Sequence, residues 1–153
     1  MSCLNGYNIR TFIMLGMRDD PRLQKTIDLM LSIEREDGGY LCEMHDRKYK
    51  TRETRSCFRG SGKLLMAFAE LPESWQHPHC LALVDYFITR EGIFQKSDQE
   101  KFVTREAART YFPFTWGAGL LDVLYAMSKM GYGRDPRLAR AWQVLEDKRD
   151  TGG

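Results

Sequence analysis

The sequence predicts an all-α protein built from repeated helical hairpins, and two repeated phrases support this prediction. The first phrase, Asp-Pro-Arg-Leu, occurs at residues 20–23 and again at residues 135–138. Each copy precedes an amphipathic stretch that ends in a Gly-Gly pair. Pro78 lies close to the midpoint between the two copies, where we expect a third copy to begin.

The second phrase sets the length of the repeat. Ser-Cys-x-x-Gly begins at Ser2 and again at Ser56, and a fainter Thr-Trp-x-x-Gly copy begins at Thr115. A period of roughly 55–60 residues is typical of stacked supersecondary units rather than of one irregular core. We therefore expect a single domain, residues 1–153, of three repeats at about 1–55, 56–110 and 111–153.

Each repeat is expected to contain two helices. In the first repeat, apolar residues at helical spacing lead to Gly16, which suits a C-terminal cap. Asp20 then caps a second helix with Pro21 at its first position, which is the favoured arrangement at a helix start. This second helix is expected to end at the Asp-Gly-Gly turn of residues 37–39.

The second and third repeats follow the same plan. We expect helices over about 56–71 and 78–92 in the second repeat, and over about 116–131 and 135–150 in the third. The first helix of each repeat is richer in Gly, Ala and apolar residues, and the second is richer in charged residues. This asymmetry predicts an inner layer buried on two sides and an outer layer with one solvent-exposed face.

The overall composition argues against several functional classes. Hydrophobic residues make up 42% of the chain and charged residues 29%, and the net charge is +2. So small a positive excess argues against nucleic acid as a partner. The sequence has no apolar run of the roughly 18 residues that a membrane span needs, and no signal-peptide pattern at its N-terminus. Four cysteines without such a signal predict reduced thiols and a cytoplasmic protein.

The end of the first outer helix supports a family resemblance. Residues 34–40 read Glu-Arg-Glu-Asp-Gly-Gly-Tyr, which is similar to the Gln-x-x-Asp-Gly-Gly-Trp motif of the terpenoid cyclase and protein prenyltransferase superfamily. Residues 56–60, at the start of an inner helix, resemble the corresponding element of that superfamily. The resemblance implies an α/α toroid, in which inner helices surround a central cavity that holds isoprenoid chains in the relatives.

The catalytic residues of that superfamily are largely missing. Squalene-type cyclases use an Asp-x-Asp-Asp motif, and residues 17–20 keep only its last two acids. Protein prenyltransferases hold zinc with an Asp-x-Cys pair and a later His; Cys57 matches the cysteine, but Arg55 stands in place of the Asp. Residues 112–116 supply no His. The motifs therefore assign no reaction, and whether the chain is an enzyme stays open.

The number of hairpins suggests a partner. Toroids of this superfamily use about six hairpins, and this sequence supplies three. Half a ring would expose apolar faces, which soluble monomers seldom tolerate. The sequence therefore predicts a homodimer in which two chains complete one toroid. The alternative is a piece of a longer toroid protein that is capped partly by its own loops.

One group of residues has the chemistry of a metal site. Cys42 and His45 have the Cys-x-x-His spacing that can bind one ion, and Cys57 lies across the following loop. Cys3 is the repeat equivalent of Cys57 and is a candidate fourth ligand. Thiolate and imidazole ligands suit zinc, and such a site would hold together a loop that lacks a core. Two alternatives remain at this point: a disulfide, and simple packing of buried cysteines.

Four residues are candidates for lining a central cavity: Phe58, Phe114, Trp116 and Asp122. Aromatic rings near the starts of inner helices line the cavity in the cyclase relatives, which implies an apolar, isoprenoid-like ligand. The alternative is that these rings form ordinary core. Lys63 and Asp122 would be unusual in a sealed core, so we expect a polar cavity or an ion pair there. The competing function is a non-enzymatic assembly module whose apolar inner faces bind partner helices.

Overall fold

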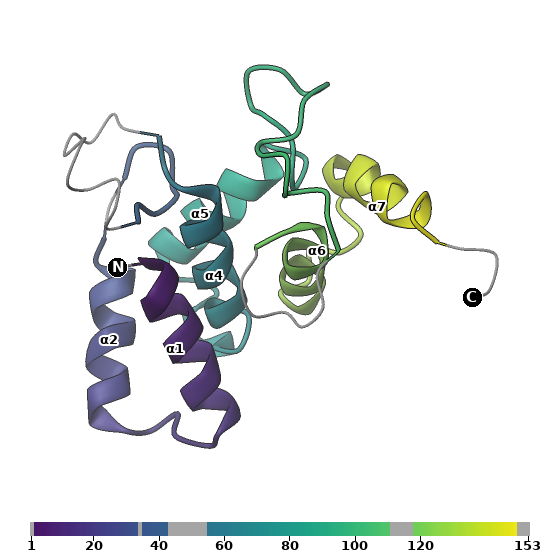
Figure 1. Ribbon diagram of the computed structural model, residues 1–153. Helices are drawn as coiled ribbons and strands as arrows, with labels where there is room; N and C mark the ends of the chain where they lie inside the picture. The colour runs from purple at the N-terminus through teal and green to yellow at the C-terminus, as the bar shows by residue number, and fades with distance from the viewer. Residues whose placement is uncertain (1, 34, 43–54, 111–117, 150–153) are drawn as a thin grey trace.

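The computed structural model describes residues 2–33, 35–42, 55–110 and 118–149, and within these residues the protein is all-helical (Figure 1). This confirms the predicted fold class. The α-helices are α1 (Ser2–Met14), α2 (Pro21–Leu31), α4 (Phe58–Phe68), α5 (Pro78–Ile88), α6 (Leu120–Lys129) and α7 (Ala139–Glu146). Two 3₁₀ turns cover Pro72–Ser74 and Pro136–Leu138. The described residues contain no β-strand, only an isolated bridge between Phe94 and Phe102.

Helices α1, α4 and α6 form one layer and run parallel to one another. Near their starts, Gly60 of α4 lies against the Cys3 side chain of α1. Near their ends, Glu70 pairs with Arg10 of α1 (3.7 Å) and with Lys129 of α6. Each of these helices also packs against the helix that follows it: α1 against α2, α4 against α5, and α6 against α7. The structure thus contains three helix pairs, with their first members side by side (Figure 1).

The outer helices begin where the sequence predicts. The Asp20 carboxylate accepts a hydrogen bond from the Arg22 amide (2.8 Å), and Pro21 occupies the first helical position. Asp135 repeats this cap, accepting from the Arg137 amide at 2.9 Å. The end of α2 differs from the expectation, because the helix stops at Leu31, several residues before the Asp-Gly-Gly turn.

That Asp-Gly-Gly turn attaches the first helix pair to the second. Asp37 accepts hydrogen bonds from the Ser56 amide (2.8 Å) and the Ser56 hydroxyl (2.6 Å), just before α4. Gly38 has a φ of 72°, and a Cβ there would lie 2.4 Å from the carbonyl oxygen of Ala82 in α5. A Cβ on Gly39 would lie 2.5 Å from that of Ser56. The two glycines are therefore required because the turn approaches its neighbours closely.

Tyr40, directly after the Asp-Gly-Gly turn, also links the first helix pair to the second. Its amide donates to the Ser61 hydroxyl of α4 (2.9 Å), and its own hydroxyl donates to the Met30 carbonyl of α2 (2.8 Å). The ring is almost completely buried. Tyr40 therefore bridges an outer helix and the next inner helix, and desolvation raises the pKa of its hydroxyl well above the ordinary value.

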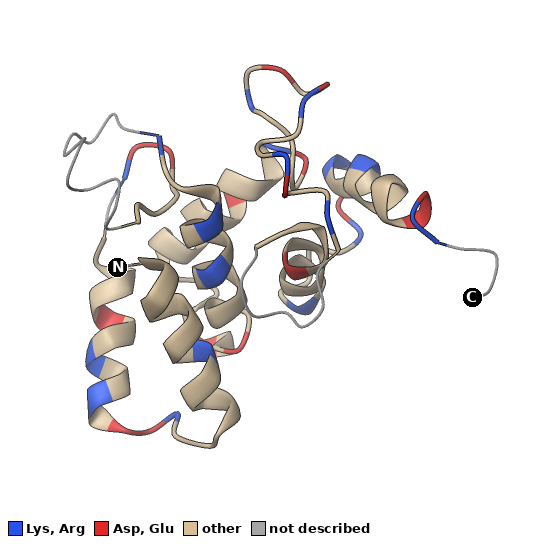
Figure 2. Cartoon of the chain, viewed as in Figure 1, with Lys and Arg blue, Asp and Glu red and all other residues tan. Residues whose placement is uncertain are grey.

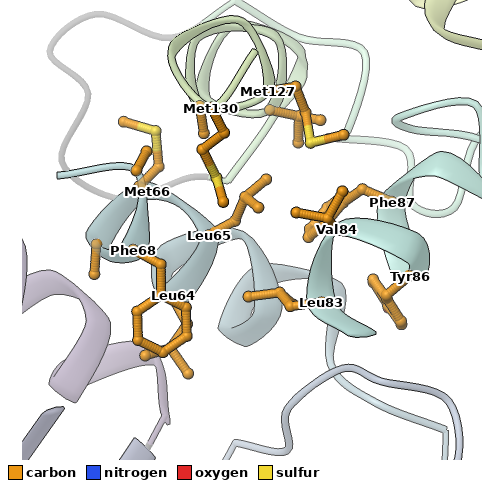
Figure 3. Close-up of a cluster of buried hydrophobic side chains, with 14 of the residues drawn as sticks. Leu64, Leu65, Met66, Phe68, Leu83, Val84, Tyr86, Phe87, Met127 and Met130 are labelled. Atoms are coloured by element: carbon orange, nitrogen blue, oxygen red, sulfur yellow. The ribbon is translucent and has the colours of Figure 1, made fainter. Parts of the chain in front are cut away.

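The main core lies between α4, α5 and α6. Side chains such as Leu65, Val84 and Met127 point into the space between these helices (Figure 3). Helix α4 is buried on almost all sides, as predicted for an inner helix. Its neighbours approach closely through small residues: a Cβ on Gly6 of α1 would lie 2.6 Å from the Lys63 carbonyl carbon, and one on Gly62 would lie 2.4 Å from the Ala118 Cβ.

Helix α1 differs from α4 in having an uncovered apolar side. It is apolar around much of its circumference, yet only one side packs against α4. Several large apolar side chains in and just after α1 are exposed: Leu4, Tyr7, Phe12, Met14 and Leu15. A helix that is apolar on all sides is usually buried on all sides.

Candidate metal centre

Three cysteine sulfurs meet at the N-terminal end of the α1–α4 pair. The Sγ atoms of Cys3 and Cys42 are 3.1 Å apart, and those of Cys42 and Cys57 are 2.7 Å apart. All three Sγ atoms lie within 4.8 Å of one another, and all three residues are half-buried. They come from three segments that are widely separated in the sequence, so the fold rather than a local motif brings them together.

The local structure explains how each cysteine reaches this point. Cys3 lies in the first turn of α1, and Cys57 is the N-cap of α4. Cys42 follows the buried Tyr40, whose carbonyl accepts a hydrogen bond from the Cys57 amide (2.8 Å). This backbone bond holds the segment that carries Cys42 beside the start of α4.

Two glycines set the approach of α1 to the cluster. Gly6 allows the backbone of α1 to lie directly on that of α4, which places Cys3 next to the start of α4. A Cβ on Gly60 would lie 3.4 Å from the Cys3 Sγ and 3.6 Å from the Cys42 Sγ. Gly60 therefore leaves space beside the sulfurs, and a large side chain at this position would enter the cluster.

The electrostatics of the cluster favour a bound cation. Hydrogen bonds with the thiols of Cys3 and Cys57, together with burial, raise the pKa of the Cys42 thiol far above its ordinary value. Three adjacent thiols cannot all ionise without a positive charge among them. A divalent metal supplies that charge and deprotonates the thiols that bind it.

The donor set fits zinc. Thiolates are preferred zinc ligands, with Zn–S distances of about 2.3 Å, so sulfurs around one tetrahedral ion lie about 3.8 Å apart. Holding one ion would require these sulfur pairs, now 3.1 Å and 2.7 Å apart, to separate by roughly 1 Å. The alternative, a disulfide, would join only two of the three clustered cysteines and would leave the third thiol next to the bond. All four cysteines lie in the described part of the chain, and none forms a disulfide.

The structure brings together two of the three predicted metal ligands, Cys42 and Cys57, and adds Cys3, which the sequence suggested through the repeat. The third predicted ligand, His45, lies outside the described residues. Cys80, the remaining cysteine, is buried in α5 away from the cluster, and burial raises the pKa of its thiol to about 11.

The residues expected to line a cavity have different surroundings. Phe58 is buried in the first turn of α4, and its ring packs edge-on against Phe87 of α5 with a centroid distance of 5.5 Å. Asp122 is buried in the first turn of α6, where one carboxylate oxygen accepts from the Gly119 amide (3.0 Å). Phe114 and Trp116 lie outside the described residues. The cavity-lining role of these four residues stays a prediction.

Sequence reasoning did not select Arg10 for any site. Arg10 lies on the same face of α1 as Tyr7, three residues earlier, and its guanidinium lies over the ring of Tyr125 in α6. The signal was the (i, i+3) spacing of an aromatic and a basic residue in an otherwise apolar helix.

Comparison with protein-family models, with curated proteins and with solved structures gave no match for this chain. Among the helices that the structure describes, none combines the length and apolar character needed to cross a bilayer. The geometry of the site and its surroundings is therefore the basis for assigning a function.

Proposed function

We propose that this chain is a zinc-binding helical-hairpin domain in which Cys3, Cys42 and Cys57 hold one ion through their thiolates. The observation that supports this most strongly is the meeting of three sulfurs, within 4.8 Å of one another, from three distant segments. Burial alone accounts for isolated cysteines such as Cys80, but not for three that converge at one point. His45 is the proposed fourth ligand, because its spacing from Cys42 allows both to bind one ion.

The proposed role of the ion is structural. Four protein ligands close a zinc site, whereas catalytic sites keep a position open for water or substrate. The ion joins the start of α1, the segment after α2 and the start of α4. Binding energy at such a site is folding energy, so the metal stabilises the contact between the first two helix pairs.

We further propose that the three helix pairs form part of an α/α toroid that a second copy of the chain completes. Two features support this arrangement: the parallel layer of α1, α4 and α6, and the uncovered apolar side of α1. In this arrangement the exposed side chains Leu4, Phe12 and Leu15 pack against the partner.

The metal assignment is tested by measuring zinc in protein purified without added metal or chelator. We expect about one zinc per chain in the wild type, and less than about a fifth of that in Cys3→Ser, Cys42→Ser and Cys57→Ser. Cys80→Ser is the matched control, because Cys80 lies away from the cluster, and it should keep its zinc. A wild-type protein without zinc, or cluster variants that retain it, would contradict the proposal.

A further inference from the structure

The closest pair of sulfurs in the cysteine cluster belongs to Cys42 and Cys57. Their Sγ atoms are 2.7 Å apart, whereas those of Cys3 and Cys42 are 3.1 Å apart. The two sulfurs of a disulfide lie about 2.05 Å apart, and two sulfurs on one tetrahedral zinc lie about 3.8 Å apart. The separation of Cys42 and Cys57 lies between these values. The pair can therefore close into a disulfide by a movement no larger than the one that opens it for zinc.

Backbone contacts hold this pair together without the help of an ion. The Cys57 amide donates to the carbonyl of Tyr40, two residues before Cys42, at 2.8 Å. The Tyr40 amide donates in turn to the Ser61 hydroxyl of α4 (2.9 Å). Cys3 has no such tie, because it belongs to α1 and reaches the pair through the packing of α1 on α4. Cys42 and Cys57 are therefore the two cysteines that the fold keeps side by side.

These two sulfurs are also accessible to a small oxidant. Cys42 and Cys57 are half-buried, whereas Cys80, the cysteine outside the cluster, is completely buried in α5. Zinc-bound cysteines are thiolates, and the thiolate is the form of cysteine that reacts with peroxides. The chain thus contains an accessible pair of reactive sulfurs and one protected sulfur for comparison.

We propose that Cys42 and Cys57 are a peroxide-sensitive pair whose oxidation to a disulfide releases the zinc. The thiolate of one residue attacks hydrogen peroxide, the O–O bond breaks, and a sulfenic acid and one water form. The thiolate of the other attacks the sulfenic sulfur, so that the S–S bond forms, the S–O bond breaks and a second water leaves. Two thiolates, one peroxide and two protons give one disulfide and two waters. A dithiol reductant reverses the change and is itself oxidised to a disulfide.

The described residues offer no ligands to replace the two that oxidation removes. Of the four proposed ligands, only Cys3 and His45 remain after the disulfide forms. Helices α1 and α4, which begin beside the cluster, contain basic residues but no acidic ones (Figure 2). No carboxylate of these helices can therefore take the place of the lost thiolates. An ion with two protein ligands is held far more weakly than one with four, so zinc leaves.

Oxidation also changes which segments of the chain the cluster joins. Zinc joins the start of α1 to the segments that carry Cys42 and Cys57, whereas the disulfide joins only the latter two. Cys3 becomes a free thiol, and α1 loses its link through the ion to the rest of the protein. The release of zinc rests on the metal site proposed above, but the pairing of Cys42 with Cys57 does not.

The proposal is tested by treating the full zinc-containing chain with an equimolar amount of hydrogen peroxide until the peroxide is consumed. The remaining thiols are then alkylated and the protein is digested with trypsin. Lys and Arg residues place the four cysteines on four separate peptides, residues 1–10, 36–47, 56–59 and 64–90. We expect mass spectrometry to find peptides 36–47 and 56–59 linked, with Cys3 and Cys80 alkylated. A zinc-sensitive dye should record release of the ion as this link forms, and dithiothreitol should separate the peptides again.

Matched variants separate this pairing from other outcomes. Cys3→Ser should still form the link even where it has lost its zinc, Cys80→Ser should behave as the wild type, and Cys57→Ser should form no link. The proposal is overturned if peptides 36–47 and 56–59 stay separate in the wild type, or if peptide 36–47 links to peptide 1–10 instead. It is also overturned if the link forms while zinc stays bound. Zinc measured before peroxide is added decides the metal site, so the two proposals fail separately.

Discussion

Replacement of Gly6 by alanine tests the contact on which both the fold and the metal centre depend. A Cβ at this position would lie 2.6 Å from the Lys63 carbonyl carbon, 2.7 Å from its oxygen and 2.8 Å from the Leu64 nitrogen. All three atoms belong to the backbone of a buried helix, so none can move aside as a side chain can. Helix α1 must instead shift away from α4.

The size of the effect follows from two opposing contributions. Alanine is favoured over glycine in a helix interior by about 1 kcal/mol. Overpacking a close contact costs about 1–3 kcal/mol, and a clash with backbone belongs at the upper end of that range. We therefore expect the free energy of unfolding to fall by about 2 kcal/mol, which for a chain of this length lowers Tm by about 4–8 °C.

Gly60→Ala is the matched control, because Gly60 occupies the equivalent position in the second copy of the Ser-Cys-x-x-Gly phrase. Its added Cβ would meet no atom closer than 3.4 Å, which is an ordinary contact. We expect this variant to keep its zinc and to gain up to about 1 kcal/mol in stability from helix propensity. Differential scanning calorimetry measures both variants.

The shift of α1 should also reach the metal centre. Cys3 lies one turn before Gly6 on α1, so displacement of the helix moves its sulfur away from Cys42 and Cys57. We expect Gly6→Ala to bind zinc less tightly than Gly60→Ala in a competition titration with a chelator. Equal stability and equal zinc affinity in the two variants would refute the proposed packing of α1 on α4.

Two other predictions concern the Asp-Gly-Gly turn and the uncovered side of α1. Burial raises the pKa of Asp37, but hydrogen bonds from Ser56 and Gly39 outweigh it and the net shift is downward. The ionised Asp37 carboxylate therefore stabilises the folded protein. This contribution is fully present above the pKa of an unfolded-state Asp, about 3.9, and is lost as the pH falls through the lower pKa of Asp37 in the folded protein. Denaturant melts from about pH 6 to pH 2 should show this loss in the wild type, while an equal loss in Asp37→Asn would count against it. Sedimentation at micromolar concentration should give a dimer for the wild type and a monomer for Phe12→Glu, which places a charge on the uncovered side of α1. The control variant Ser97→Glu, in a loop, should stay dimeric. A monomeric wild type would rule the dimer out.

The helix starts were predictable because they depend on local chemistry. Asp20 and Asp135 each precede a proline and accept a hydrogen bond from a nearby amide, so four consecutive residues suffice to identify the cap. The end of α2 was not predictable in the same way. The chain leaves the helix at Leu31, before the Asp-Gly-Gly turn, because Asp37 and Tyr40 must reach hydrogen-bond partners on the next inner helix.

The cysteine cluster could be predicted only in part. The spacing of Cys42 and His45 and the repeat relation of Cys3 and Cys57 identified the candidates, because these are features of the chain itself. The sequence could not show that Cys3 comes within 3.1 Å of Cys42, since that proximity depends on the packing of α1 on α4. From the sequence alone, metal binding, a disulfide and simple packing of buried cysteines all stayed open, because the sequence does not give the distances between the sulfurs.

The two buried charged residues Lys63 and Asp122 show a similar limit. Lys63 and Asp122 could be recognised as charged residues in apolar helices. Their surroundings depend on the distances between three helices, which are a property of the tertiary structure: the Lys63 ammonium lies near the Tyr7 ring, and the Asp122 Oδ1 is buried without a hydrogen-bond partner. The spacing of Tyr7 and Arg10 marks one face of α1, but the contact of Arg10 with Tyr125 depends on how α1 and α6 pack and could not be predicted.

X-ray absorption at the zinc edge of the purified protein tests the central claim most directly. Three thiolates and one imidazole on a single ion predict three sulfur neighbours at about 2.3 Å and one nitrogen at about 2.0 Å. Replacing Cys3 by serine should remove one of the sulfur neighbours or release the ion. A spectrum without sulfur neighbours, or one with a full set of three after that replacement, would show that Cys3, Cys42 and Cys57 do not share a metal.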